Sequence, residues 1–334
     1  MARQFERPQL SKDQKRRIKS LYQRSNRRGF FSIGVDYLWI GVACLLSIGV
    51  HPAFYPLSVL IIGARQRTLA SLFHDASHGT LFRTKGLSKT VGRLCCGWPL
   101  LQSLRAYRKS HVRARHFELG DAGSDPDYVQ MRAVGVYATQ RGHRFFRQFV
   151  LSPLCGGLTF QYVRSLLAHR LFATDQDTGA HAESRLILIF HASIATICCV
   201  TETLSYLALF WWVPLLVIHP AIGWLSELAE HYPLMQRSSA PCFCSRNRYA
   251  GWIERQFIGM HADHLHLTHH LLPGIPHWNL EAATEILRED TNFKAWDSTW
   301  GGIFTSESGS HISFIAYVRG QRHVGKTTPS ARHS

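Results

Sequence analysis

The sequence from His261 to Leu280, HADHLHLTHHLLPGIPHWNL, holds six of the chain's twenty histidines. On a helix, His266, His269 and His270 stand at positions i, i+3 and i+4, so the spacing predicts that all three imidazoles leave one face. Neutral imidazoles are common ligands of transition metals. A surface cluster of unrelated histidines fits poorly with three of them at helical spacing before a proline-bounded turn. The stretch therefore predicts part of a metal site, whose other ligands must come from elsewhere in the chain.

The composition favours a membrane protein with a basic cytoplasmic side. The 334 residues carry a formal net charge of +16, with an isoelectric point near 9.8. The basic residues flank apolar stretches and do not alternate with exposed aromatic residues, so we do not expect a nucleic-acid-binding module. The eight cysteines lie mostly in apolar segments and are expected to be reduced. Cys242 and Cys244 are interpreted as two free thiols in a loop rather than as a metal site.

Four apolar segments predict membrane spans with both termini in the cytoplasm. Arg65 and Arg67 fall in the second segment, and because charges are costly in lipid they must face protein or lie near the cytoplasmic interface. The loops 51–52 and 201–203 carry no Lys or Arg, which the positive-inside rule assigns to the outside. A soluble helical protein whose core helices resemble spans is the alternative. The predicted spans are residues 29–50, 53–73, 186–201 and 204–226.

The remaining segments are polar or too short to span a membrane. Residues 1–28 contain ten Lys or Arg against two acids and predict a basic cytoplasmic arm. Residues 94–104 suit a re-entrant piece, and residues 145–172 suit a helix at the membrane interface. The main domain is expected to cover residues 29–300, followed by a polar and partly disordered tail over residues 305–334.

Further histidines follow the predicted spans on their cytoplasmic side. His74 and His78 come directly after the second span, and His231 follows the fourth, one turn after Glu227. This shared depth in the membrane predicts one common site. The eight candidate metal ligands are His74, His78, His111, His116, His231, His266, His269 and His270, with Glu227 and His264 as possible additions.

Eight imidazoles are too many for one tetrahedral zinc and suit two metal ions. An all-nitrogen dinuclear site at a membrane surface favours iron and the activation of dioxygen. A zinc protease is not indicated, because the chain contains no His-Glu-x-x-His motif. A histidine-lined metal transporter or storage protein is the alternative from another class. It would place ligands along the spans, where the sequence offers only His191 and His219.

With these motifs the chain resembles the membrane fatty acid desaturase superfamily over roughly residues 30–290. His74-Asp-Ala-Ser-His78 is similar to its first histidine box, and His266-Leu-Thr-His269-His270 to its third. The resemblance implies an all-α membrane fold, with four spans under a cytoplasmic helical cap that holds two non-haem irons. It also implies an integral protein of the bacterial inner membrane. Dioxygen and a separate electron donor, of the ferredoxin or cytochrome type, are the implied reactants.

The second box departs from the family pattern at Arg115. The sequence from His111 to His116 has arginine where a third histidine is expected, and a protonated guanidinium does not ligate metals. Either the site has one imidazole fewer, or Glu227, Glu230 or His264 completes it. Four aspartates are candidates for orienting the imidazoles, with helix capping or turn formation as their alternative roles: Asp75, Asp125, Asp127 and Asp263.

The resemblance implies an oxidoreductase that introduces a carbon–carbon double bond, although hydroxylation uses the same oxidant. An acyl chain or another lipid-like molecule is the first expectation for the substrate. Some members of the superfamily act instead on small amino-acid-derived metabolites, including the desaturase that completes the enol-ether amino acid rhizobitoxine. The arginines near the boxes favour this alternative, because they could bind a carboxylate or phosphate: Arg105, Arg108, Arg113 and Arg115.

Overall fold

The computed structural model describes residues 8–109, 119–121, 123, 125–157, 159–171, 178–237, 243–308 and 311–320. Apart from two isolated bridges, its regular elements within these ranges are all helical. The protein is therefore an all-α protein in the part described, as the sequence predicts. The second histidine box, with His111, Arg115 and His116, lies outside the described residues, as does Cys242.

Three helices are long and apolar enough to cross a membrane among the residues that the structure describes. They cover Asn26–Val50, Gly179–Val200 and Leu204–His231. The first joins α2 (Asn26–Leu45) to η1 (Leu46–Val50), the second lies in α10 (Thr178–Val200), and the third joins α11 (Leu204–Leu207), η8 (Ala208–Trp212) and α12 (Val213–His231). These helices match three of the four predicted spans, except that the second begins seven residues earlier than predicted and the third ends five residues later.

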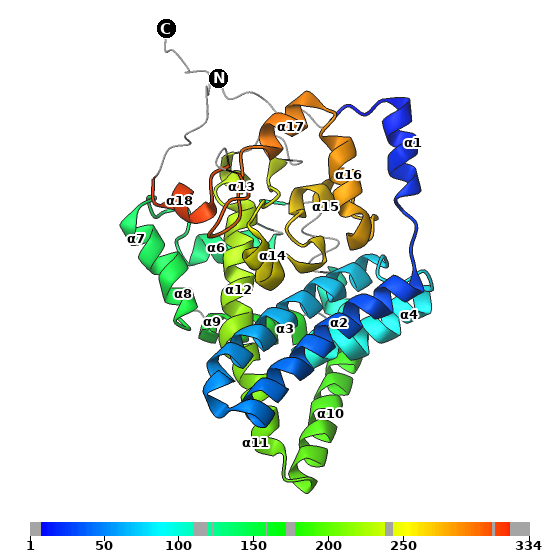
Figure 1. Cartoon of the computed structure of the whole chain (residues 1–334), viewed down its shortest axis with the longest axis vertical. Helices are drawn as coiled ribbons and strands as arrows, with labels where there is room; N and C mark the ends of the chain where they lie inside the picture. Colours follow the sequence, from blue (N-terminus) through cyan, green and yellow to red (C-terminus); the bar gives the residue numbers. More distant parts are fainter. Residues whose placement is uncertain are drawn as a thin grey trace.

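The remaining predicted span, 53–73, is a continuous helix, α3 (Tyr55–His78), preceded by η2 (Pro52–Phe54), but it is not among these three. Most of α3 is buried, including both Arg65 and Gln66. Figure 1 shows α3 beside α2 and α12, which shield it from its surroundings. Arg65 pairs with buried Asp36 of α2 at 3.5 Å and donates to the backbone carbonyl of Gln256. These contacts explain how an internal helix accommodates charges that lipid would not. The four-span arrangement itself stays a prediction.

The helices α3 and α12 are in close contact at Gly63. A Cβ atom at this position would overlap the side chain of Ile218 on α12. Glycine is therefore required here, because interiors are packed without room for an extra methyl group. Both helices end near the histidines. The helix α3 ends at Gly79, whose left-handed φ of 73° suits glycine.

The cap above these helices is built from short pieces (Figure 1). The predicted interfacial helix over residues 145–172 is broken into several segments, with Gly156 at a positive φ of 80° between them. After α3, the described chain up to Leu171 forms α4 (Lys85–Val91), η3 (Gly92–Gly97), η4 (Trp98–Leu100), α5 (Leu104–Tyr107), α6 (Pro126–Ala133), α7 (His143–Phe146), η6 (Arg147–Leu151), α8 (Ser152–Leu154), α9 (Thr159–Ser165) and η7 (Leu166–Leu171).

The C-terminal half supplies the rest of the cap, and the basic arm folds onto it. In the arm, α1 (Lys12–Ser20) pairs Arg17 with Glu289 at 2.7 Å. The last helix, α18, lies within residues 305–334, the segment that the sequence predicts to be a polar tail. The cap helices are α13 (Leu234–Arg237), α14 (Trp252–Ile258), η10 (Met260–Ala262), α15 (His266–Leu271), η11 (His277–Asn279), α16 (Leu280–Leu287), α17 (Thr291–Asp297) and α18 (Phe314–Val318).

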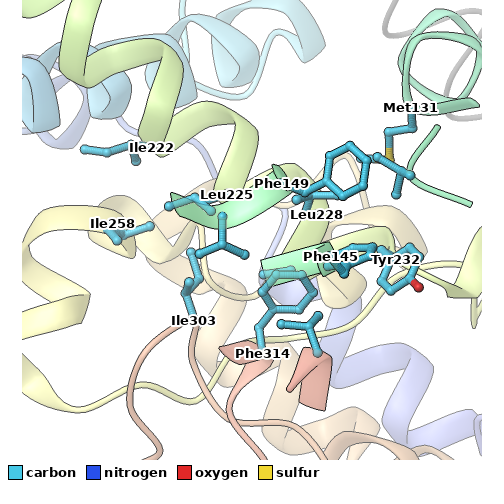
Figure 2. Packing of buried hydrophobic residues seen from close by; sticks show 14 of the residues in the cluster. Met131, Phe145, Phe149, Ile222, Leu225, Leu228, Tyr232, Ile258, Ile303 and Phe314 are labelled. Atoms are coloured by element: carbon cyan, nitrogen blue, oxygen red, sulfur yellow. The ribbon is translucent and has the colours of Figure 1, made fainter. Parts of the chain in front are cut away.

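An apolar cluster fixes the end of α12 to the cap. Figure 2 shows Leu225 and Leu228 of α12 among side chains from several distant segments, including Phe145 and Phe314. The rings of Phe145 and Tyr232 lie 4.7 Å apart between centroids. Burying these side chains away from water supplies the main driving force for this packing. The cluster therefore holds the C-terminal end of α12, which carries His231, in a fixed place.

Candidate metal centre

Six of the predicted ligands gather into two clusters. The first contains His74, His78 and His269, and the second contains His231, His266 and His270. Within each cluster the candidate ligand atoms lie within 4.8 Å of one another. α3 contributes the first pair, one turn apart, while α12 and α15 contribute the rest. His264 belongs to neither cluster in the described part of the chain, and its Nδ1 donates to the carbonyl of Gly259.

The histidines of the third box divide between the clusters. His266 and His270 face His231, whereas His269 faces His74, with ring centroids 4.3 Å apart. The three imidazoles, which the spacing predicts on one face, are therefore divided between two adjacent clusters. Successive helix positions differ by about 100°, so His269 and His270 point in clearly different directions. Their ring centroids are 6.0 Å apart, which places the two clusters side by side.

The nitrogen atoms of both clusters converge as they would around a cation. His266 Nε2 lies 3.0 Å from both His231 Nε2 and His270 Nε2, and in the other cluster His74 Nε2 lies 3.2 Å from His78 Nε2. Nitrogen ligands lie about 2 Å from a first-row metal, so two of them on one ion are at most about 4 Å apart. The spacing of these imidazoles therefore fits metal binding.

The tautomer of His231 also suits a metal ligand. Its Nδ1 lies 3.0 Å from the carbonyl oxygen of Cys244, which can only accept a hydrogen bond. The proton is therefore on Nδ1, and the lone pair is on the Nε2 that faces His266. Sequence reasoning did not find this backbone contact, since no residue type marks it. The thiol of Cys244 is free and buried.

Two glutamates lie beside the second cluster. Glu227 Oε1 lies 3.9 Å from His231 Nε2, and Glu230 Oε2 lies 3.6 Å from His266 Nε2. Both carboxylates and His231 form a further group that could hold a metal ion. Imidazole together with carboxylate is a donor set that suits iron, manganese and zinc. Glu227 and Glu230 are two of the three groups that the sequence offers as substitutes for the missing imidazole of the second box.

Burial keeps the imidazole of His78 neutral. Loss of water around it lowers its pKa to about 4, and the nearby Arg108 acts in the same direction, although Asp75 opposes the shift. A neutral imidazole keeps a lone pair for a metal, whereas imidazolium has none. The apolar surroundings therefore prepare this side chain to act as a ligand.

A group of buried charged side chains, which pair with one another, lies next to the clusters. Arg248 forms ion pairs with Glu230 at 2.8 Å and Asp263 at 3.0 Å. Asp263 also accepts from Ser71 at 2.7 Å and pairs with Arg67 at 3.5 Å. Burial would raise the pKa of Asp263, but the two guanidiniums outweigh it and lower the pKa. Asp263 thus fixes the third box to α3 and α12.

Asp75 and Asp125 differ in role, although the sequence offered both for orienting imidazoles. Asp125 caps α6 by accepting from the backbone of Asp127 and Tyr128, which is the structural alternative. Asp75 accepts from Nδ1 of His277 at 2.8 Å and so joins the first box to the turn after the third. The other ring nitrogen of His277 lies 2.9 Å from the hydroxyl of Ser32.

Replacing Asp75 with alanine is expected to destabilise the protein by about 1–3 kcal/mol, because the buried His277 donor would lose its acceptor. The melting temperature in detergent measures this loss. Asp75→Asn retains a carbonyl oxygen and should lose less. Equal melting temperatures for Asp75→Ala and the unsubstituted protein would contradict the role assigned to Asp75.

Comparisons with known proteins show the family of the chain. The family model named Fatty acid desaturase matches residues 51–297. The chain belongs to this family. A relative from Bradyrhizobium elkanii, described as dihydrorhizobitoxine desaturase, is 33% identical over 319 residues, which cover 94% of this chain and 90% of the relative. The desaturase is thus an oxidoreductase, and its apolar helices make it an integral membrane protein.

Proposed function

We propose that this desaturase binds two non-haem irons and uses dioxygen to introduce a carbon–carbon double bond. The convergence of six imidazoles into two adjacent clusters carries this proposal. His74, His78 and His269 would hold one iron, and His231, His266 and His270 the other, with Glu227 or Glu230 in reach of the second. His111 and His116 are proposed to complete the set. Irons bound there would supply the oxidising chemistry, with electrons from a separate ferredoxin or cytochrome-type donor.

We propose that the substrate binds in a cavity beside the clusters. A cavity of about 240 Å³ is lined by His74, His266, His269 and Glu230 as well as by side chains of α3, α6 and α12. Within the described residues, the clustered histidines lie at the C-terminal ends of α3 and α12 and on α15, and not along the predicted spans. This arrangement favours an enzyme over a metal transporter. We propose that both termini and the site face the cytoplasm, in the bacterial inner membrane, with four spans.

Two classes of substrate are consistent with the family, an acyl or lipid-like chain and a small amino-acid-derived metabolite. The described cavity favours the second class, because Arg67, Gln102, Asp127 and Gln130 are among its lining residues. Its volume is also below the roughly 300–1,000 Å³ of pockets that bind drug-sized ligands. The name of the Bradyrhizobium elkanii relative agrees with this class.

The proposed function is tested by metal analysis and product analysis together. Purified protein is expected to contain two irons per chain with a Mössbauer signature of non-haem iron, and one zinc per chain would contradict this. Cells that express the protein are then fed candidate substrates. A new double bond in a small amino acid, with an unchanged fatty acid profile, would support the metabolite class. A changed fatty acid profile would support the lipid class instead.

A further inference from the structure

The cavity ends on a polar floor, formed by Arg67 and His219 with Gly223 beside them. Of the residues that line the cavity, Arg67 on α3 and His219 on α12 lie furthest from the C-terminal ends of these helices, where the histidine clusters stand. Gly63, one turn before Arg67, packs directly against Ile218, the residue before His219, and this contact closes the space between the two helices. Arg67 precedes His74 by seven residues, or about 10 Å along the helix axis.

The floor is charged, unlike the closed end of a channel for a long alkyl chain. The Arg67 guanidinium is largely buried, and it donates from Nη1 to the Ser71 hydroxyl at 2.7 Å and from Nη2 to the Asp263 carboxylate at 3.5 Å. An arginine carries five N–H donors. In the described part of the chain, two of these donors bond to Ser71 and Asp263, and the other donors lie beside the cavity that Arg67 lines. A ligand that brings acceptor atoms into the cavity could bind these donors.

The walls between the floor and the clusters are partly apolar. Ala70, Met131, Pro220 and Trp224 line this middle section. A substrate that fills the cavity therefore needs a short apolar middle and an acceptor at its deep end. Arg105 and Arg108, which the sequence offered for binding an acid, do not line the cavity, and Arg108 donates instead to the carbonyl of Ser77.

We propose that the polar floor binds the carboxylate of a short substrate, which enters acid end first and leaves its carbon chain beside the histidine clusters. A guanidinium matches a carboxylate through two parallel hydrogen bonds. The distance from Arg67 to the clusters then sets which carbon is oxidised. This inference rests on the proposed function for the reaction, but the binding site stands on the cavity alone.

Gly223 allows the floor to be altered without disturbing its charges. A Cβ atom at this position would lie 4.0 Å from Cδ and Nε of Arg67, which is an ordinary contact. Alanine is also favoured over glycine inside a helix by roughly 0.5–1 kcal/mol, so Gly223→Ala should fold. The added methyl group would occupy space beside the guanidinium. Gly41→Ala is the matched control, because a Cβ there meets nothing within 4 Å.

The test measures binding of six-carbon probes to the protein in lipid nanodiscs by saturation-transfer NMR and calorimetry. Hexanoate is expected to bind, with hexyl phosphate and 1-hexanol at least roughly tenfold weaker, a difference of about 1.4 kcal/mol. Gly223→Ala and Arg67→Gln should each weaken hexanoate roughly tenfold, while Gly41→Ala leaves it unchanged. Tighter binding of hexyl phosphate would assign the floor to a phosphate and overturn the carboxylate. Absent hexanoate binding, or equal binding of hexanoate and 1-hexanol, would overturn the proposal.

Iron content is measured on the same samples, which separates this inference from the proposed function. Loss of hexanoate binding in Gly223→Ala with full iron content supports the polar floor. Full hexanoate binding in both floor variants overturns it, whatever the iron content. A preparation without iron that still prefers hexanoate would support the floor and contradict the diiron proposal alone.

Discussion

His266→Ala is expected to lower the iron content from two per chain to one and to abolish desaturation. His266 Nε2 is the central atom of the second cluster, within 3.0 Å of two other imidazole nitrogens. His269→Ala should remove the other iron, because His269 faces His74 and His78 instead. Two neighbouring histidines of one short helix would thus control different irons. Elemental analysis gives the stoichiometry, and Mössbauer spectroscopy shows whether the remaining iron is mononuclear.

The matched control for these variants is His264→Gln. His264 lies in the same stretch and is buried, but it is outside both clusters, and a glutamine amide can still donate to the carbonyl of Gly259. This variant should keep two irons. If His266→Ala and His269→Ala each kept two irons, the assignment of these clusters as the metal site would be wrong. If each lost both irons, the clusters would not be separate sites.

The sequence predicted this site at the level of motifs but not of partners. Helical spacing brought together the boxes at residues 74–78 and 266–270, and the apolar segments placed them at matching depths. How His266 and His269 divide between clusters depends on the direction from which α3 and α12 approach α15, which spacing within one helix does not specify. The carbonyl of Cys244 and the guanidinium of Arg248 carry no sequence signal at all. They reach the site through tertiary packing.

Sequence patterning predicted the apolar helices well and the polar ones less well. Three predicted spans correspond to helices that can cross a membrane. The helix α3 differs because neighbouring helices bury it. Arg65 and Arg67 are tolerated there because each pairs with a carboxylate, Asp36 and Asp263 respectively. The predicted interfacial helix over residues 145–172 contains Pro153 and two adjacent glycines, and the chain turns there, with Gly156 at positive φ. Apolar periodicity alone did not reveal these breaks.

Arg248→Met is expected to destabilise the protein by about 3–5 kcal/mol, because removing one partner leaves buried charges without compensation. The side chains of Arg248 and Glu230 are both about 2% exposed, and Asp263 is 12% exposed. Without the guanidinium, these two carboxylates would repel each other beside the second cluster. The melting temperature in detergent should fall accordingly.

Iron loading of the Arg248→Met protein distinguishes the contribution of Arg248 to folding from a direct effect on the metal site. Bound iron supplies positive charge next to Glu230, so it should recover part of the lost stability through preferential binding to the folded state. The iron-loaded and iron-free forms of Arg248→Met should therefore differ more in melting temperature than those of the unsubstituted protein. Arg255→Met is the matched control, because Arg255 pairs with Glu281 at 3.0 Å on the surface, where such pairs contribute about 0–1 kcal/mol. Equal losses for the two variants would contradict the role of Arg248 as the buried counter-charge that holds the third box against α12.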